Sequence, residues 1–367
     1  MNILFTCGGT AGHINPAVAL ARLFQERHPG CKVLFVGADG GMETRLVPQE
    51  GFELKTVTIS SFYRSLSPAA IKHNVGTLLN LNRSKKQANT ILDEFKPDLV
   101  VGTGGYASFP VVKAAAKRGI PTAVHESNAV PGLTTKTLSK VVDAVMVGFE
   151  DSRAHYDNPE KVVVTGTPVR GDFFRYTRQE ARAQLGLTDD KPLLLSFFGS
   201  LGADVMNGYM GEFFKLEQEN GFPFHHIHSA GRNYDAMKAD CPESSMLDLR
   251  PYIYDMPLVC AAADLVICRA GASTIAELAA IAKPSILVPS PNVTADHQTK
   301  NAEVLSGHGG AVLLPESDCS GPVLYERAAG ILSDCAKRDE MVRALSSQSI
   351  TDAAEQIYQV LTGLIRR

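Results

Sequence analysis

Two glycine-rich segments, each directly after an apolar run, have the composition of phosphate-binding loops. Residues 8–12 (GGTAG) follow the apolar residues 3–7, and residues 199–203 (GSLGA) follow residues 193–197. Residues without large side chains let backbone N–H groups approach an anion, and a helix that starts after such a loop adds the positive end of its dipole. The sequence therefore predicts a phosphate-bearing ligand.

Two side chains next to predicted loops could move a proton. His13 follows the first glycine-rich loop, and an imidazole has an ordinary pKa of about 6.5, close to working pH. His13 is our candidate general base, and Glu126, after the apolar residues 122–124, is the second candidate. The alternative is that His13 only binds a phosphate or fixes the loop.

Residues 264–302 form the most informative stretch. Residues 265–268 and 285–288 predict two buried strands joined by a small-residue turn and a helix from Thr274 to Ile281. Glu277 on that helix is a candidate ligand-binding acid. Alternatively, Thr274 and Glu277 form a capping box, in which Glu277 only bonds to its own helix start. Gln298 is a further polar candidate, or a solvated residue in the first turn of the next helix.

Several classes of protein are disfavoured. The chain has no Walker A lysine, HExxH, CxxC or GxSxG motif, so we expect neither a fixed metal nor a cofactor. Seven cysteines without paired spacing indicate a reducing compartment. A net charge of −3 does not favour nucleic-acid binding. Because the first loop nearly matches a dinucleotide fingerprint, with Cys7 in place of its first glycine and Asp39 as a ribose-binding acid, an NAD-dependent oxidoreductase is a rival function.

The elements that must position these residues predict an α/β protein of two domains. The length of 367 residues exceeds one ordinary core, and each half begins with a strand, a glycine-rich loop and a helix. We expect two Rossmann-like domains facing across a cleft, residues 1–167 and 168–349, with a helix in residues 350–367 packing back on the first. In the first domain, Asn15 is expected to cap a helix that has Pro16 at its first position.

Residues 54–92 contain no acid and combine basic with apolar residues. A basic helix with an apolar stripe is typical of binding to an anionic membrane surface; the alternative is that the stripe packs on the core. No apolar run is long enough to span a bilayer. The candidate docking residues are Ile71, Lys72, Val75, Leu78, Leu79, Arg83, Lys85 and Lys86.

Motifs in order along nearly the whole chain resemble the MurG-type transferases: GGTAGHINPA, GGYASFP, HESNAVPG, GTPVR, CRAGASTIAE, PSILVP and DHQTKNA. The resemblance implies the GT-B fold and inverting transfer of N-acetylglucosamine from UDP-N-acetylglucosamine. The acceptor would be the C4 hydroxyl of the N-acetylmuramyl unit of lipid I, undecaprenyl-pyrophosphoryl-N-acetylmuramyl-pentapeptide. The product would be lipid II for peptidoglycan, made at the cytoplasmic face of the cell membrane. A related transferase with another lipid acceptor, or a non-catalytic scaffold, is an alternative.

The resemblance also implies roles for individual residues: Asn128 and Gln298 would contact the sugar, Arg170 and Ser200 the phosphates, Ile253 the uracil, and Glu277 the ribose. The residues expected to bind UDP-N-acetylglucosamine are Thr10, Ala11, Gly12, Asn128, Arg170, Ser200, Ile253, Ala272, Ser273, Thr274, Ile275, Ala276, Glu277 and Gln298. Two positions depart from the family pattern. Phe198 replaces a glycine of the second loop, which is expected to narrow the phosphate pocket, and Ser229 replaces a glutamine.

Overall fold

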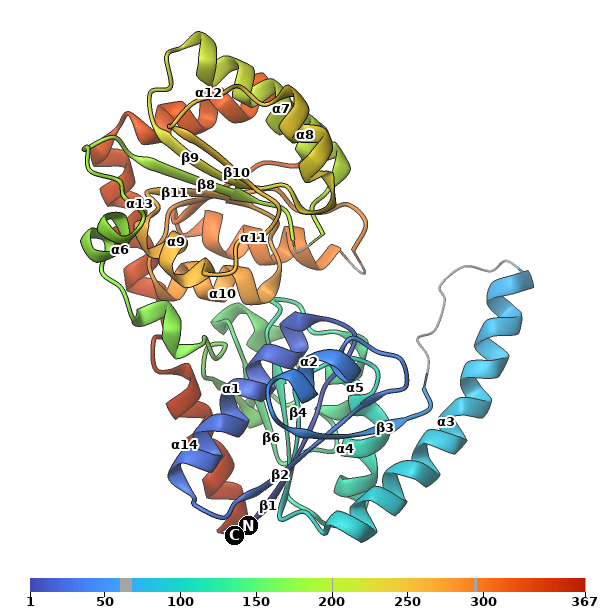
Figure 1. Cartoon of the computed structure of the whole chain (residues 1–367). Coiled ribbons are helices and arrows are strands. Elements are labelled where there is room, and N and C mark those ends of the chain that lie inside the picture. The colour runs from blue at the N-terminus through green and yellow to red at the C-terminus, as the bar shows by residue number, and fades with distance from the viewer. Residues whose placement is uncertain (60–67, 200, 294–295, 367) are drawn as a thin grey trace. The chain divides into compact units, whose positions relative to one another are not determined.

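The computed structural model describes residues 1–59, 68–199, 201–293 and 296–366; the side chains of residues 68–79 and 348 are outside the description. Contacts divide the chain into two units. Unit 1 is Met1–Val169 with Ile350–Arg367, and unit 2 is Arg170–Ser349. Both are parallel sheets with helices packed on them, as expected for two Rossmann-like domains (Figure 1).

Unit 1 has, within the described residues, a seven-stranded sheet in the order β3-β2-β1-β4-β5-β6-β7. Its strands are β1 (Asn2–Thr6), β2 (Lys32–Ala38), β3 (Glu53–Val57), β4 (Leu99–Gly102), β5 (Thr122–Glu126), β6 (Ala144–Val147) and β7 (Val162–Val164). Its helices are α1 (Ala11–Arg27), α2 (Glu43–Gln49), α3 (Pro68–Phe95), α4 (Ser108–Lys117), α5 (Leu133–Leu138) and α14 (Ala353–Ile365).

Alternating side chains of β1 serve two cores, one on each face of this sheet. Ile3 and Phe5 pack with residues of α1 and α14, whereas Leu4 packs with residues of α3 and α4. A strand buried on both faces must be apolar throughout, which explains the continuous apolar run at residues 3–5.

The C-terminal helix α14 belongs to the core of unit 1. Ile357 and Leu361 are fully buried there. The Tyr358 ring lies 5.0 Å from that of Phe24 on α1, and its hydroxyl is hydrogen-bonded to Nε2 of His28 (2.8 Å). The last turns of the chain therefore complete a core that its first turns begin.

Unit 2 has a six-stranded sheet in the order β10-β9-β8-β11-β12-β13, again within the described residues. Its strands are β8 (Leu193–Phe197), β9 (His225–Ser229), β10 (Leu247–Arg250), β11 (Leu265–Cys268), β12 (Ser285–Leu287) and β13 (Ala311–Leu313). Its helices are α6 (Arg178–Gln184), α7 (Asp204–Glu219), α8 (Tyr234–Asp240), α9 (Met256–Ala262), α10 (Ala272–Ala280), α11 (His297–Gly307), α12 (Gly321–Leu332) and α13 (Cys335–Gln348).

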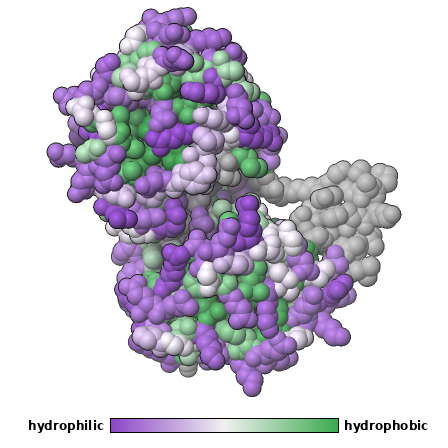
Figure 2. Space-filling model, in the orientation of Figure 1, coloured by the Kyte–Doolittle hydropathy of each residue, from purple (hydrophilic) through white to green (hydrophobic). Residues whose placement is uncertain are grey.

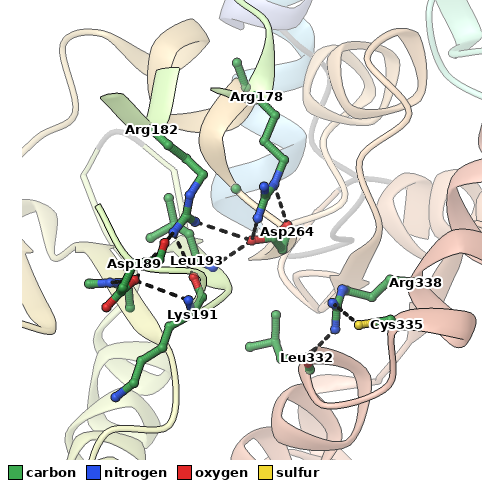
Figure 3. A network of polar contacts seen from close by, with 12 residues as sticks. Arg178, Arg182, Asp189, Lys191, Leu193, Asp264, Leu332, Cys335 and Arg338 are labelled. Atoms are coloured by element: carbon green, nitrogen blue, oxygen red, sulfur yellow. Dashed lines mark hydrogen bonds and ion pairs between the residues drawn. The ribbon is translucent and has the colours of Figure 1, made fainter. Parts of the chain in front are cut away.

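A polar network fastens α6 to the amino ends of the two central strands of this sheet (Figure 3). Arg178 donates two hydrogen bonds to the carboxylate of Asp264, from Nε at 2.8 Å and Nη2 at 3.0 Å. The same carboxylate accepts the backbone N–H of Leu193 (2.8 Å). Paired, bidentate contacts of this kind are among the stronger polar interactions. Because the network lies at the amino ends of β8 and β11, the carboxyl ends of these strands remain open for binding.

The structure corrects the predicted start of the first helix. The helix α1 begins at Ala11 with Thr10 as its N-cap, so Asn15 is not the cap and Pro16 lies inside the helix. Its first hydrogen bonds run from the N–H groups of His13 and Ile14 to the carbonyl of Thr10, because the chain turns helical as soon as it leaves the glycines.

Hydrophilic side chains cover most of the surface that Figure 2 shows, with apolar residues in separate patches. Among the described residues, no helix combines the length and apolar character needed to span a membrane.

Candidate functional site

Both sheets reverse their strand order at a point where two loops diverge. In unit 1 the reversal lies between β1 and β4, and in unit 2 between β8 and β11. Ligands of open α/β sheets bind outside the carboxyl ends of the strands at such points. The loops that follow these four strands therefore define one candidate site in each unit.

In unit 1 the two loops pack glycine against glycine. Gly105 has φ +82°, and a Cβ atom there would overlap the backbone of Gly8. Gly9 also adopts a positive φ, +86°, which L-residues with side chains rarely adopt. Thr10, Ala11 and Gly12 follow at the start of α1, with Thr10 exposed.

His13 contacts both the loop after β1 and the loop after β4. Its Nδ1 lies 2.8 Å from the carbonyl oxygen of Gly8, and its own carbonyl accepts the hydroxyl of Thr103 (2.6 Å). A carbonyl can only accept, so Nδ1 carries the proton and Nε2 of the neutral ring keeps a lone pair. The ring lies so close to Gly104 that a Cβ atom there would be 2.5 Å from Cδ2.

Glu126, the second candidate base, is engaged in holding its own loop. Oε1 accepts the backbone N–H (3.1 Å) and side-chain N–H (2.8 Å) of Asn128, and Oε2 accepts the N–H of Gly132 (3.0 Å). Its neighbour His125 is fully buried, which lowers the pKa of its imidazole. These contacts favour His13 over Glu126 as the group that takes up a proton.

Glu43, which the sequence did not single out, lies beneath the first loop. Its side chain is fully buried, Oε2 accepts the N–H of Gly9 (3.1 Å) and Oε1 that of Ala38 (2.7 Å). Burial, reinforced by the Glu43 charge, raises the pKa of both the Cys7 thiol and the Tyr106 hydroxyl. The only sequence signal was an acid two residues after a glycine pair, in GGMETRLVP.

In unit 2 a cavity of about 530 Å³ opens at the point where the strand order reverses. It lies at the carboxyl ends of β8 and β11, between the second glycine-rich loop and the start of α10. Its lining residues are Phe197, Phe198, Gly199, Gly202, Ala203, Asp204, Val205, Arg269, Gly271, Thr274, Ser290, Asn292, Gln298 and Glu316.

The helix α10 carries Glu277, and the capping-box interpretation of this residue is wrong. The helix begins at Ala272 with Gly271 as its N-cap, so Glu277 lies beyond the first turn and makes no capping bond. Burial raises the pKa of Glu277 to about 7, although the Arg170 guanidinium opposes this shift. Hydrogen bonds from hydroxyl donors would stabilise the ionised form of a carboxyl group whose pKa burial has raised.

The other predicted ligand-binding residues of α10 differ in how far their side chains are buried. Ala272, Ser273, Thr274 and Ala276 are half-buried, whereas the side chain of Ile275 is fully buried in the unit. A ligand at this helix start would therefore meet backbone N–H groups and the Thr274 side chain.

Gln298 has a fixed orientation. Its amide oxygen accepts the N–H of Ser290 (2.8 Å), which leaves the amide NH₂ as the group available to a ligand in the cavity.

The remaining predicted donor-binding residues of unit 2 lie outside α10. Ile253, after β10, is buried, so only its backbone could contact a base. Arg170 is half-exposed with Nε 3.6 Å from Asp172, and Ser200 lies outside the described residues.

The two departures from the family pattern have different positions. Phe198 lines the cavity, but its ring is almost wholly buried against the core, 6.1 Å from that of His228. Ser229 is buried at the end of β9.

Where residues are described, no group of three His, Cys, Asp or Glu could hold a metal ion.

Asp39, the ribose acid of the NAD alternative, is engaged by threonines. Hydrogen bonds from Thr56 and from Thr58, whose hydroxyl donates to Oδ2 (2.8 Å), lower the pKa of this carboxyl. The N–H of Gly9, which a pyrophosphate would need, already binds Glu43. Neither group favours a dinucleotide in unit 1.

Two family models match the chain. Residues 3–147 match the glycosyltransferase family 28 N-terminal domain, and residues 193–357 match the glycosyltransferase family 28 C-terminal domain.

Full-length relatives agree with these matches. A protein of Acetivibrio thermocellus is 40% identical over 100% of this chain and 99% of its own length, and one of Bacillus subtilis is 38% identical over 99% of each. Both are named UDP-N-acetylglucosamine--N-acetylmuramyl-(pentapeptide) pyrophosphoryl-undecaprenol N-acetylglucosamine transferase.

Among solved structures, Acinetobacter baumannii MurG superposes with a TM-score of 0.79 at 28% identity and covers 99% of both chains. The calicheamicin glycosyltransferase CalG4 shares the fold, with a TM-score of 0.70 at 16% identity over 98% of both chains.

Proposed function

The chain belongs to glycosyltransferase family 28 and is a UDP-N-acetylglucosamine-dependent transferase of the MurG type, and from this premise we propose how its residues divide the reaction. The acceptor is the N-acetylmuramyl-pentapeptide carried on undecaprenyl pyrophosphate that the relatives' names specify. The observation that carries this assignment is identity of about 40% over the full length of proteins so named.

Unit 2 binds the donor. The cavity at the ends of β8 and β11 has the mixed lining that a nucleotide sugar requires, and the N-terminus of α10 has no acid in its first turn to repel a diphosphate. Glu277 accepts the ribose hydroxyls, and the amide NH₂ of Gln298 donates to the sugar. The backbone of Ile253 reads the uracil.

Unit 1 binds the acceptor and supplies the base. The C4 hydroxyl oxygen of the N-acetylmuramyl unit forms a bond to the anomeric carbon while the bond from that carbon to the UDP oxygen breaks. The hydroxyl proton passes to Nε2 of His13, the nitrogen that keeps a lone pair. Attack opposite the leaving group inverts the anomeric configuration.

The departing UDP takes up negative charge. Arg170 is half-exposed and close enough to Glu277 to oppose the rise of its pKa, so its cationic group is available beside the donor site. Together with Ser200, Asn128 and the N–H groups at residues 10–12, it would balance the developing charge of the diphosphate and orient the donor sugar.

The acceptor's lipid chain places the reaction at a membrane surface, and we propose that this is the cytoplasmic face of the cell membrane. Arg83, Lys85 and Lys86 are exposed on α3, whose residues Ala88 and Leu92 anchor it to unit 1. The cationic residues attract anionic lipids. Ile71, Lys72, Val75, Leu78 and Leu79 lie on the same helix, with side chains outside the described residues, and remain the predicted docking stripe.

The experiment that tests this function follows radiolabel from UDP-N-acetylglucosamine into a short-chain lipid I analogue without added metal. We expect label in the lipid fraction only when the muramyl acceptor is present. A matched reaction with diacylglycerol in its place separates the related-transferase alternative. Donor binding in calorimetry without transfer to lipid I would contradict the assigned acceptor.

A further inference from the structure

The mechanism above does not use Glu43, although this side chain is fully buried directly under the first glycine-rich loop. The site around it is built for a carboxylate. A Cβ atom on Gly8 or on Gly41 would lie 2.5 Å from its Oε1, and a Cβ atom on Gly37 would overlap its side chain. Three glycines, Gly8 after β1, Gly37 in β2 and Gly41 before α2, thus make room for one buried acid. Burial of a carboxylate costs free energy unless hydrogen bonds compensate for its lost hydration.

The two contacts of the Gly8–Gly9 peptide group connect Glu43 to His13. The N–H of this peptide, on Gly9, donates to Oε2 of Glu43 (3.1 Å). The carbonyl of the same peptide, on Gly8, accepts from Nδ1 of His13 (2.8 Å). A single planar unit therefore has the carboxylate on one side and the imidazole on the other.

This peptide needs an external constraint. It lies between two glycines, which have no Cβ atoms to restrict its rotation, and Gly9 already has φ +86°. If the peptide turned over, the N–H of Gly9 would face His13 in place of the Gly8 carbonyl, and the Nδ1 proton would lose its acceptor. The Glu43 carboxylate accepts the N–H and so keeps the carbonyl toward the ring.

The geometry points to Glu43 as a positioning residue that selects the His13 tautomer through the Gly8–Gly9 peptide. The arrangement performs the task of an acid hydrogen-bonded directly to a catalytic histidine, with one peptide group inserted between them. The negative charge also polarises the peptide, which strengthens the hydrogen bond from the imidazole. The catalytic consequence rests on the proposed role of His13; the effect on the tautomer does not.

The test is ¹⁵N NMR of the histidine rings at a pH where the imidazole is neutral, in protein labelled on histidine. The His13 signals are assigned by their loss in H13Q. The wild type should show a protonated Nδ1 and an unprotonated Nε2. In E43Q, which keeps the shape but removes the charge and one acceptor, and in E43M, which removes both acceptors, we expect a mixture or the Nε2–H form.

A matched control comes from unit 2, where Glu217 is equally buried and its Oε1 lies 2.9 Å from Nδ1 of His226. E217Q should alter the ring signals of His226 and leave those of His13 unchanged. Thermal melting establishes that each variant is folded. If E43Q and E43M are folded and His13 keeps the wild-type tautomer in both, the inference is wrong.

Kinetics separate this inference from the proposed function. E43Q should lower kcat by about 10- to 100-fold with little change in the donor KM, and the E43Q/H13Q double variant should be no slower than H13Q alone. Additive losses would contradict action through His13. If H13Q retained normal turnover, the proposed base would be wrong, while a tautomer change in E43Q would still establish the positioning role.

Discussion

Donor binding should depend on pH through Glu277. Burial raises the pKa of this carboxyl from 4.5 to about 7. The ionised form accepts a ribose hydroxyl at each oxygen, whereas protonation turns one of the two oxygens into a donor and removes the charge. The group is therefore mostly ionised above pH 7 and becomes protonated as the pH falls through that value. UDP-N-acetylglucosamine should bind more weakly at lower pH.

The magnitude follows from the ionised fraction. With a pKa of about 7, roughly nine-tenths of Glu277 is ionised at pH 8 and one-tenth at pH 6. The dissociation constant should rise about tenfold between these conditions, which corresponds to roughly 1.4 kcal/mol. UDP-N-acetylglucosamine is the right probe because its diphosphate is a diester and does not titrate in this range.

Isothermal titration calorimetry at several pH values, on the wild type and E277Q, measures the effect. The variant should bind more weakly than the wild type at pH 8, and its affinity should be nearly independent of pH. Without donor, E277Q should melt at a higher temperature than the wild type at pH 8. A folded acid with a raised pKa loses stability as the pH rises from 4.5 to 7. Equal pH dependence in both proteins would refute the reasoning.

Three further predictions address unit 1. H13A should reduce turnover by about 10²-fold in the lipid I assay while calorimetry shows unchanged donor affinity; near-normal turnover would eliminate His13 as the base. G105A should abolish transfer or lower the melting temperature, because its Cβ atom would overlap the backbone of Gly8. Wild-type activity and melting temperature in this variant would show that the two loops can move apart at little cost in free energy. K85E/K86E should lower co-flotation with phosphatidylglycerol-rich vesicles by about tenfold or more, with transfer in detergent retained, whereas undiminished flotation would argue against docking through α3.

Apolar strands were the most predictable part of the fold. Residues 193–197 and 265–268 were expected as strands, and β8 and β11 have these bounds because strands buried on both faces leave no place for polar residues. The strands β3, β10 and β13 were not predicted. They lie at or beside sheet edges, and the ELKTV of β3 and LDLR of β10 carry exposed polar side chains that weaken the apolar signal.

The positions of candidate site residues were predictable where the local sequence determines them. His13 follows its loop by one residue, and contacts within that loop orient it. Glu43 depends instead on the approach of residues 34 positions away, which a one-dimensional pattern does not encode. The start of α10 was misplaced because Thr274 imitates an N-cap, whereas the extended backbone at Gly271 already starts the helix.

The return of α14 to unit 1 has a consequence for biosynthesis. A ribosome synthesises all of residues 170–349 before it makes the helix that supplies Ile357 and Leu361 to the core of unit 1. Residues 170–349 are therefore made while unit 1 still lacks its last helix, and during that time the apolar face of α1 around Phe24 stays uncovered. The unit whose synthesis begins first is therefore the one whose core receives its final residues last.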